Sequence, residues 1–151
     1  MHNDSDCTEF VSFTIAGQMF GLPIARVQDV FKPLQMTRVP LAGAEIAGVL
    51  NLRGRIVTAI DMRNRLQAHK REDGTAAMAI GIETKGESFG LLVDAVGEVL
   101  KLPDSGREPN PINLDRKLAA LSAGIYRLDG RLLVVLDIDQ VLDLSAEVAA
   151  A

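Results

Sequence analysis

With 151 residues, of which 48% are hydrophobic, the chain is long enough to form one domain whose core needs no disulfide bonds. A net charge of −4, five Phe, one Tyr and no Trp argue against the basic surface and the aromatic stacking platforms of a nucleic-acid-binding protein. A single cysteine, Cys7, and no apolar run of the roughly 18 residues that span a bilayer predict a cytoplasmic protein without direct membrane insertion.

Short strands joined by tight turns are predicted along the first part of the chain. Apolar and polar side chains alternate in residues 10–15 (FVSFTI), as in a strand with one solvent-exposed face, and residues 19–24 (MFGLPI) form the return strand. Residues 25–31 (ARVQDVF) fit either a strand or a short helical turn. A further strand runs up to a turn at Arg53 and Gly54.

The strand after this turn, residues 55–60 (RIVTAI), is apolar on both faces, which predicts burial from both sides. Asp61 follows it in the position of a helix N-cap, where a carboxylate accepts hydrogen bonds from the amides of the first turn. We therefore expect one or two helical turns after Asp61. The charged residues 67–74 (QAHKREDG) are predicted to form a loop.

The second part of the chain contains a similar series of strands and turns. A loop with three prolines and a short helix separate its first three strands from its last hairpin. These strands are expected at residues 76–84, 87–94, 96–102, 122–130 and 131–138, with the loop at 103–113 and the helix at 114–121.

An internal repeat explains this similarity. Residues 48–61 (GVLNLRGRIVTAID) align without a gap with residues 124–137 (GIYRLDGRLLVVLD), a shift of 76 positions. Residues 17–30 (GQMFGLPIARVQDV) align in the same way with residues 86–99 (GESFGLLVDAVGEV), a shift of 69 positions. Two aligned blocks in the same order indicate a duplicated unit, although short β-hairpins can also resemble one another by chance.

The repeat divides the predicted domain, residues 8–145, into halves at about 8–68 and 76–145, between flexible termini at 1–7 and 146–151. Each half is too small to bury a large core alone, so the halves are expected to pack around a shared interior. Val57 and Leu133 are equivalent in the repeat, and both are predicted to be buried in that interior.

Residues capable of catalysis or metal binding are scarce. His2 lies in a polar terminus and His69 in the charged loop, and Cys7 has no histidine near it in the sequence. Asp61 and Asp137 are equivalent in the repeat, and helix capping explains them better than a catalytic pair. The sequence therefore predicts no enzyme activity, cofactor or metal, and favours an adaptor or scaffold.

The sequence resembles the CheW family of bacterial chemotaxis adaptors. The resemblance begins with FVSFTIAGQMFGLPIARVQDVF, RVP and IAGVLNLRGRIVTAIDMRNRL, in which N-L-R-G precedes an aliphatic strand and Asp. It continues through GESFGLLVDAVGEVLKL and ends with GIYRLDGRLLVVLDIDQVL. The family's fold implies an all-β protein: two SH3-like five-stranded β-barrel subdomains packed around a shared hydrophobic core, with short helical turns.

This resemblance implies a non-enzymatic adaptor that couples transmembrane chemoreceptors to the histidine kinase CheA. Its partners would be the regulatory CheW-like domain of the kinase and the cytoplasmic tip of the receptors. The protein would then be cytoplasmic and recruited to receptor arrays at the membrane. No nucleic acid, cofactor or metal is implied.

The family's functional motifs assign eight residues of this chain to the receptor and kinase interface, and the family usually has Glu where this chain has Asp29. The eight residues are Val27, Asp29, Val30, Gly48, Arg53, Gly54, Val96 and Val99. Asp29 and Arg53 are expected to lie near one another, and Val96 and Val99 to face a groove between the barrels. Without the resemblance, Arg53 would be read as a solvated residue at a hairpin tip and Val96 and Val99 as core residues.

Four alternatives stay open at this stage. The module could belong to a chemotaxis-like pathway with an output other than motility, or it could be a part detached from a CheA kinase. A tandem SH3-like nucleic-acid binder would need a basic face, and an enzyme would need a cluster of titratable side chains.

Overall fold

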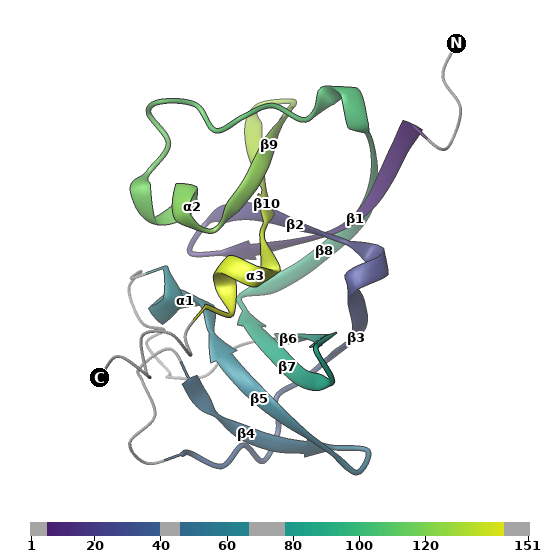
Figure 1. Cartoon of the computed structure of the whole chain (residues 1–151), viewed down its shortest axis with the longest axis vertical. Coiled ribbons are helices and arrows are strands. Elements are labelled where there is room, and N and C mark those ends of the chain that lie inside the picture. The colour runs from purple at the N-terminus through teal and green to yellow at the C-terminus, as the bar shows by residue number, and fades with distance from the viewer. Residues whose placement is uncertain (1–5, 40–45, 67–77, 144–151) are drawn as a thin grey trace. The chain divides into compact units, whose positions relative to one another are not determined.

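The computed structural model describes residues 6–39, 46–66 and 78–143. Strands dominate these residues and are hydrogen bonded into two five-stranded sheets, with a few short helices (Figure 1). The predicted all-β class is therefore confirmed. The chain forms two compact units, which we call unit 1 (Met1–Ile24 with Gly97–Ala151) and unit 2 (Ala25–Val96).

Each sheet combines hairpins with one additional strand. The first sheet contains, in spatial order, β8 (Ala95–Pro103), β1 (Cys7–Ile15), β2 (Gln18–Pro23), β10 (Arg131–Leu136) and β9 (Ser122–Leu128). The second contains β3 (Val27–Phe31), β6 (Met78–Thr84), β7 (Glu87–Val93), β5 (Arg55–Asp61) and β4 (Ile46–Leu52). The helices are α1 (Met62–Arg65), α2 (Arg116–Ala120) and α3 (Ile138–Val141), with 3₁₀ turns at Ile24–Arg26 and Asp104–Gly106.

The two sheets do not coincide with the sequence halves at 8–68 and 76–145. The β1–β2 hairpin of the first half joins the sheet of β8, β9 and β10, whereas the β6–β7 hairpin of the second half joins the sheet of β3, β4 and β5. The halves have therefore exchanged their first hairpins. The hydrogen-bonding edge of a hairpin can pair with a strand from its own half or with the equivalent strand of the other half. The repeat alone could therefore not reveal this exchange.

The strand registers confirm that the elements are equivalent. The parallel contact of β10 with β2 aligns Leu133 with Met19, and that of β5 with β7 aligns Val57 with Ser88. Leu133 and Val57 differ by 76 positions, and Ser88 and Met19 by 69, which are the two shifts found in the sequence. The duplication thus extends to the hydrogen-bonded register of the exchanged hairpins.

An isolated bridge next to one edge of each sheet brings that sheet close to a barrel. After β3, the chain returns to pair Thr37 with Val49 of β4, and after β8 it returns to pair Glu108 with Ile125 of β9. Both bridges have two backbone hydrogen bonds of 2.8 to 2.9 Å. Within the described residues no regular pairing joins β3 to β4 or β8 to β9, so neither sheet is a fully closed barrel.

Unit 1 has a core built around aromatic rings. Phe10 and Tyr126 make an edge-to-face contact with ring centroids 5.5 Å apart, and Leu133 and Val135 complete the cluster. The guanidinium of Arg107 lies 5.8 Å from the centroid of the Phe10 ring, within cation–π distance. These contacts fix β1, β9 and β10 to one another.

Unit 2 has a smaller cluster of Ala59, Ala79 and Leu92, against which Phe31 and Ala47 pack. Val57 and Leu133 are both buried, as predicted, each within the sheet of its own unit. A shared interior between the two halves stays a prediction.

The short helices begin where the sequence predicts. Asp61 caps α1, accepting hydrogen bonds from the amides of Arg63 and Asn64, and Asp137 caps α3 through the amide of Gln140. Capping therefore accounts for both equivalent aspartates. A bidentate contact holds α1 to the end of β7: Arg63 Nε and Nη2 donate to Asp94 at 3.0 and 2.6 Å.

Several sequence-based expectations need correction. Residues 25–31 form both a 3₁₀ turn and a strand. The strand predicted to be buried on both faces, β5, buries the consecutive residues Ala59 and Ile60, which point to opposite faces, but leaves Ile56 64% exposed, so only its second half is buried on both faces. β1 begins at Cys7, earlier than the strand predicted at 10–15.

Some predicted features cannot be assessed in the structure. His2, His69, the loop at 67–74 and the tail at 146–151 lie outside the described residues. No helix in the part of the chain that the structure describes is long and apolar enough to cross a membrane.

Candidate functional site

Seven of the eight residues assigned to the interface belong to unit 2. Val96 is the last residue of that unit, and the other six lie on β3, on β4 and in the turn between β4 and β5. These six are Val27, Asp29 and Val30 of β3, Gly48 of β4, and Arg53 and Gly54 of the turn.

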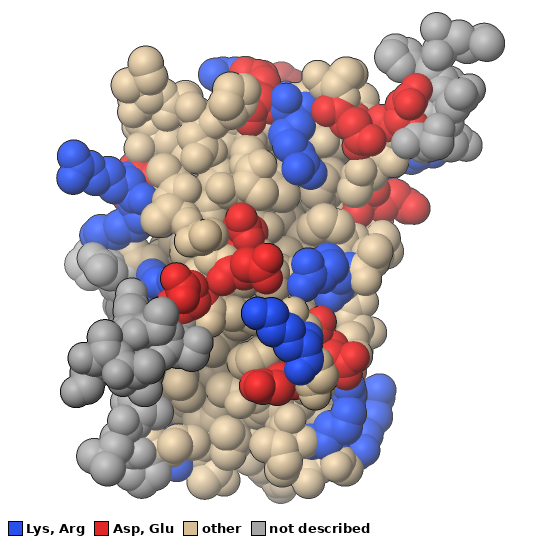
Figure 2. Space-filling model, viewed as in Figure 1, with Lys and Arg blue, Asp and Glu red and all other residues tan. Residues whose placement is uncertain are grey.

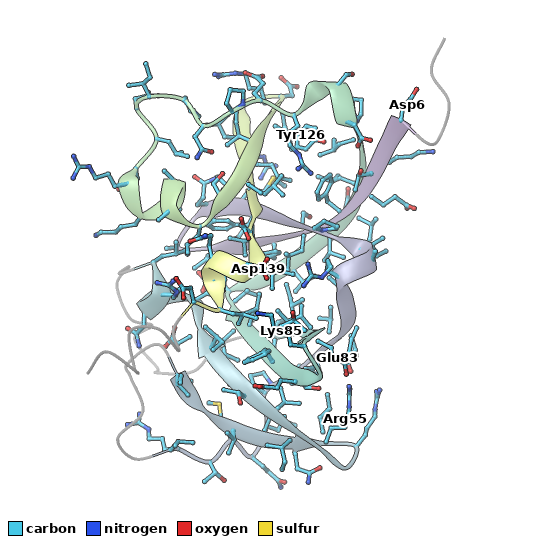
Figure 3. The ribbon with its side chains drawn as sticks, viewed as in Figure 1. Asp6, Arg55, Glu83, Lys85, Tyr126 and Asp139 are labelled. Carbon is cyan, nitrogen blue, oxygen red and sulfur yellow. The ribbon has the colours of Figure 1, made fainter. Side chains whose placement is uncertain are left out.

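Asp29 and Arg53 lie close together, as predicted from the family resemblance. Arg53 Nη1 is 3.7 Å from Asp29 Oδ2, with the Arg53 side chain 78% exposed and that of Asp29 19% exposed. A second contact runs beside it, in which Arg55 Nη1 donates to Gln28 Oε1 at 2.9 Å. Two arginines of the β4–β5 hairpin thus contact two consecutive residues of β3, and Figure 3 labels Arg55 at the end of this hairpin.

Turn geometry places Arg53 at the hairpin tip. Arg53 and Gly54 both have positive φ, 54° and 85°, as in a two-residue type I′ turn whose twist suits a hairpin. Asn51 Oδ1 accepts a hydrogen bond from the Gly54 amide at 2.9 Å and so fixes the turn. The backbone of Arg53 is therefore held in a fixed turn, whereas its side chain is exposed.

Sheet curvature brings β3 to this hairpin. In the hydrogen-bonded order, β6 and β7 separate β3 from β5, yet side chains of β3 and of the β4–β5 hairpin are in contact. A β-bulge contributes, because Val27 pairs with Ile82 and Asp29 with Gly81, which leaves Gln28 as the extra residue. Bulges bend a strand and redirect its side chains, and this one lies beside the ion pair.

Gly48 has a structural role beside the bridge between Thr37 and Val49. A Cβ atom at this position would collide with the carbonyl oxygen of Thr37 and would stand 2.9 Å from Met36 Cγ. The bridge between Thr37 and Val49 therefore requires a glycine here. A role for Gly48 in partner binding stays a prediction.

Apolar side chains are exposed on the same strands. Val30 of β3 is 39% exposed, and Ile56 of β5 follows directly after Arg55. An exposed aliphatic side chain next to a charged pair is typical of a protein-binding surface with an apolar centre and a polar rim.

The equivalent positions in the other sheet cannot form the same pair. Glu98 corresponds to Asp29 and Asp129 corresponds to Arg53, so two acidic residues replace a pair of opposite charges. The duplicated elements have kept their backbone register and lost this charge pattern. The candidate site is therefore specific to unit 2.

Val96 and Val99 lie on β8, which is hydrogen bonded into the sheet of β1, β2, β9 and β10. Val96 is half-buried, and Val99 is 48% exposed, so Val99 is not a core residue. The groove predicted for these two residues stays a prediction.

Sequence reasoning missed Gly81 of β6. A Cβ atom at Gly81 would collide with Asp29 Oδ1, so the Asp29 carboxylate occupies the place of a side chain. The available signal was an isolated glycine inside a predicted strand, which often marks a close approach of another group.

Charge on the face shown in Figure 2 is mixed, with basic and acidic side chains next to one another among uncharged residues. Among the residues that the structure describes, no three His, Cys, Asp or Glu side chains are grouped as metal ligands would be.

Comparison with known proteins gives a consistent result. A family model for a CheW-like domain matches residues 9–146. The chemotaxis protein CheW of Thermotoga maritima is 30% identical over 135 residues, which cover 89% of this chain and 87% of that protein. The chemotaxis protein CheA of Salmonella typhimurium is 25% identical over 138 residues, 91% of this chain but only 20% of that protein.

A solved structure supports the fold. The crystal structure of the scaffolding protein TtCheW from Thermoanaerobacter tengcongensis is 31% identical and matches with a TM-score of 0.78. The match covers 87% of this chain and 84% of that one.

Proposed function

Since the chain belongs to the CheW-like domain family, we propose that it is a non-enzymatic adaptor that couples transmembrane chemoreceptors to the histidine kinase CheA. The observation that carries this proposal is the family match over residues 9–146, together with relatives of similar length named chemotaxis protein CheW. The adaptor would act in the cytoplasm and be recruited to receptor arrays at the membrane. No chemical step is assigned to it.

The similarity to part of CheA supports the choice of kinase as a partner. A segment that makes up 20% of the Salmonella typhimurium protein resembles nearly all of this chain. Two related β modules can present related strand edges and turns to each other. The receptor tip is proposed as the second partner on the resemblance alone.

The ion pair of Asp29 and Arg53 is the proposed centre of the interface, with Val27, Val30 and Gly54 beside it. Its exposure supports this role, because an arginine that is 78% exposed contributes little to folding. The same side chain can form a charge-assisted contact with an acidic group of a partner, which gives orientation as well as affinity. Val96 and Val99 are proposed to extend the receptor-binding surface.

A pull-down tests the proposal directly. The full chain, immobilised, is mixed with the purified regulatory domain of CheA and, separately, with a receptor cytoplasmic fragment. We expect both proteins to be retained, and an unrelated SH3-like domain serves as the control for non-specific binding. Retention of neither partner at micromolar concentrations would contradict the proposal.

A further inference from the structure

The carboxylate of Asp29 lies directly against the backbone of Gly81 on the neighbouring strand. The two residues are paired between β3 and β6. A Cβ atom at Gly81 would collide with Asp29 Oδ1 and stand 3.4 Å from Asp29 Cγ. Gly81 is not among the residues with positive φ, so its own backbone does not require glycine. The neighbouring carboxylate does.

The position of this carboxylate is unfavourable for folding. Asp29 Oδ1 is buried and accepts no hydrogen bond, while Oδ2 faces Arg53. A buried carboxylate oxygen without a donor destabilises a fold, so core packing alone would not select it. A buried polar atom without a hydrogen-bond partner is uncommon in a native fold. Such destabilising groups are found at binding sites, where function rather than stability is selected.

The other half of the repeat places the glycine of this strand pair on the neighbouring strand instead. Ser12 of β1 is equivalent to Gly81, and its Oγ donates to the Glu98 carbonyl oxygen at 2.6 Å. Glu98, the equivalent of Asp29, is exposed. A Cβ atom at Gly97 of β8, the equivalent of Gln28, would stand 2.8 Å from Ser12 Oγ, so a glycine on the neighbouring strand makes room for the Ser12 side chain, and the acidic residue next to it lies at the surface.

We propose that Gly81 is a positioning residue of the interface. Because Gly81 has no side chain, the Asp29 carboxylate can lie against its backbone beside the β4–β5 hairpin. There the carboxylate orients the Arg53 guanidinium toward an acidic group of the partner. This inference rests on the proposed function, because it assumes a partner that binds at the pair. The shorter side chain of Asp, compared with Glu, suits a carboxylate that must lie so close to β6.

The test uses Gly81→Ala, Asp29→Ala and the double variant in the full chain. Gly90→Ala is the matched control, because Gly90 pairs directly with Gly81 and a Cβ atom there would approach no atom closer than 3.4 Å. Melting temperatures and the affinity for the CheA regulatory domain are measured for all four.

We expect Gly81→Ala to lower the melting temperature when Asp29 is present. In the double variant the methyl group fills the vacated space and alanine restricts the unfolded chain, so the melting temperature should rise about 1 to 4 °C above that of Asp29→Ala. Gly81→Ala, Asp29→Ala and the double variant should each bind the kinase domain about tenfold more weakly, whereas Gly90→Ala binds normally. Because the double variant should bind no more weakly than Asp29→Ala, the effect of Gly81→Ala on binding depends on the carboxylate, which is not expected of a purely structural residue.

The possible failures are distinguishable. If Gly81→Ala lowers the melting temperature equally with and without Asp29, the added methyl group does not act through the carboxylate and the proposal is wrong. If Asp29→Ala weakens binding but Gly81→Ala does not, the positioning role alone is overturned. If Asp29→Ala binds normally, the proposal fails together with the functional role of the ion pair.

Discussion

Truncation of Leu133 should destabilise the whole protein. This residue is fully buried, and its neighbours in the core of unit 1 are Phe10, Tyr126 and Val135. Leu to Ala substitutions in cores destabilise by about 2 to 5 kcal/mol, depending on how far the surroundings collapse into the cavity. Aromatic rings already in edge-to-face contact can move little, so we expect a loss of about 3 to 4 kcal/mol.

For a chain of this length, that loss corresponds to a fall in melting temperature of roughly 6 to 16 °C. Val57→Ala, at the equivalent position of the repeat, removes two methyl groups and should cost about 2 kcal/mol. Differential scanning calorimetry and urea titration measure both variants against the parent protein.

Both variants should shift a single cooperative transition, because each sheet contains strands from both sequence halves and the halves are predicted to share a core. Two separate transitions, of which Leu133→Ala moves only one, would refute the shared core. A loss below about 1 kcal/mol would refute the argument that the aromatic neighbours prevent collapse.

Three further predictions concern stability and can be checked by urea denaturation. Gly21→Ala should destabilise the fold by about 1 to 3 kcal/mol, because the added Cβ would stand 2.9 Å from Leu133 Cδ2. Gly90→Ala, whose Cβ would have no contact shorter than 3.4 Å, should be neutral or slightly stabilising. Equal losses of stability for the two variants would contradict this prediction. Tyr126→Phe should stabilise by about 1 kcal/mol, since the buried hydroxyl has no hydrogen-bond partner, and a clear loss would mean that it has one. Asp61→Ala should cost about 0.5 to 2 kcal/mol by uncapping α1, and an unchanged midpoint would argue against the cap.

Local features of this fold were readable from the sequence. Alternation of apolar and polar residues located the strands, and glycines located the hairpin turns at Gly17, Gly54 and Gly86, all of which have positive φ. The repeat predicted which elements are equivalent, and the register of Leu133 with Met19 and of Val57 with Ser88 agrees with it. These features depend on neighbours in the chain or on internal comparison.

The exchange of hairpins was not predictable in the same way. Strand pairing depends on backbone edges that look alike in both halves, so the pattern of β2 is equally suited to β5 and to β10. The exposure of Ile56 was missed because composition cannot tell which part of an apolar strand is covered by other elements.

The candidate site was located by family resemblance rather than by pattern. Asp29 and Arg53 belong to different strand pairs, and they meet only because the sheet curls and Gln28 forms a bulge. Neither curvature nor a bulge has a clear signature in one sequence. Gly81, whose missing side chain makes room for Asp29, became interpretable only when its neighbour was known.

The most direct test of the account is Arg53→Glu in a reconstituted assay of receptor, CheA and this chain. The exposed pair contributes only about 0 to 1 kcal/mol to folding, so the melting temperature should stay near that of the parent protein. Like charges at the interface cost several kcal/mol, enough to dissociate a micromolar complex. Lys85→Glu is the matched control. Lys85 is an exposed cation at the first turn residue of the β6–β7 hairpin, the place that Arg53 has in the β4–β5 hairpin, and its φ is 53° (Figure 3).

The account predicts that Arg53→Glu abolishes receptor-dependent kinase activation while Lys85→Glu retains it, with circular dichroism spectra unchanged for both. Normal activation by a folded Arg53→Glu variant would contradict the central claim that this pair is where the adaptor meets its partners.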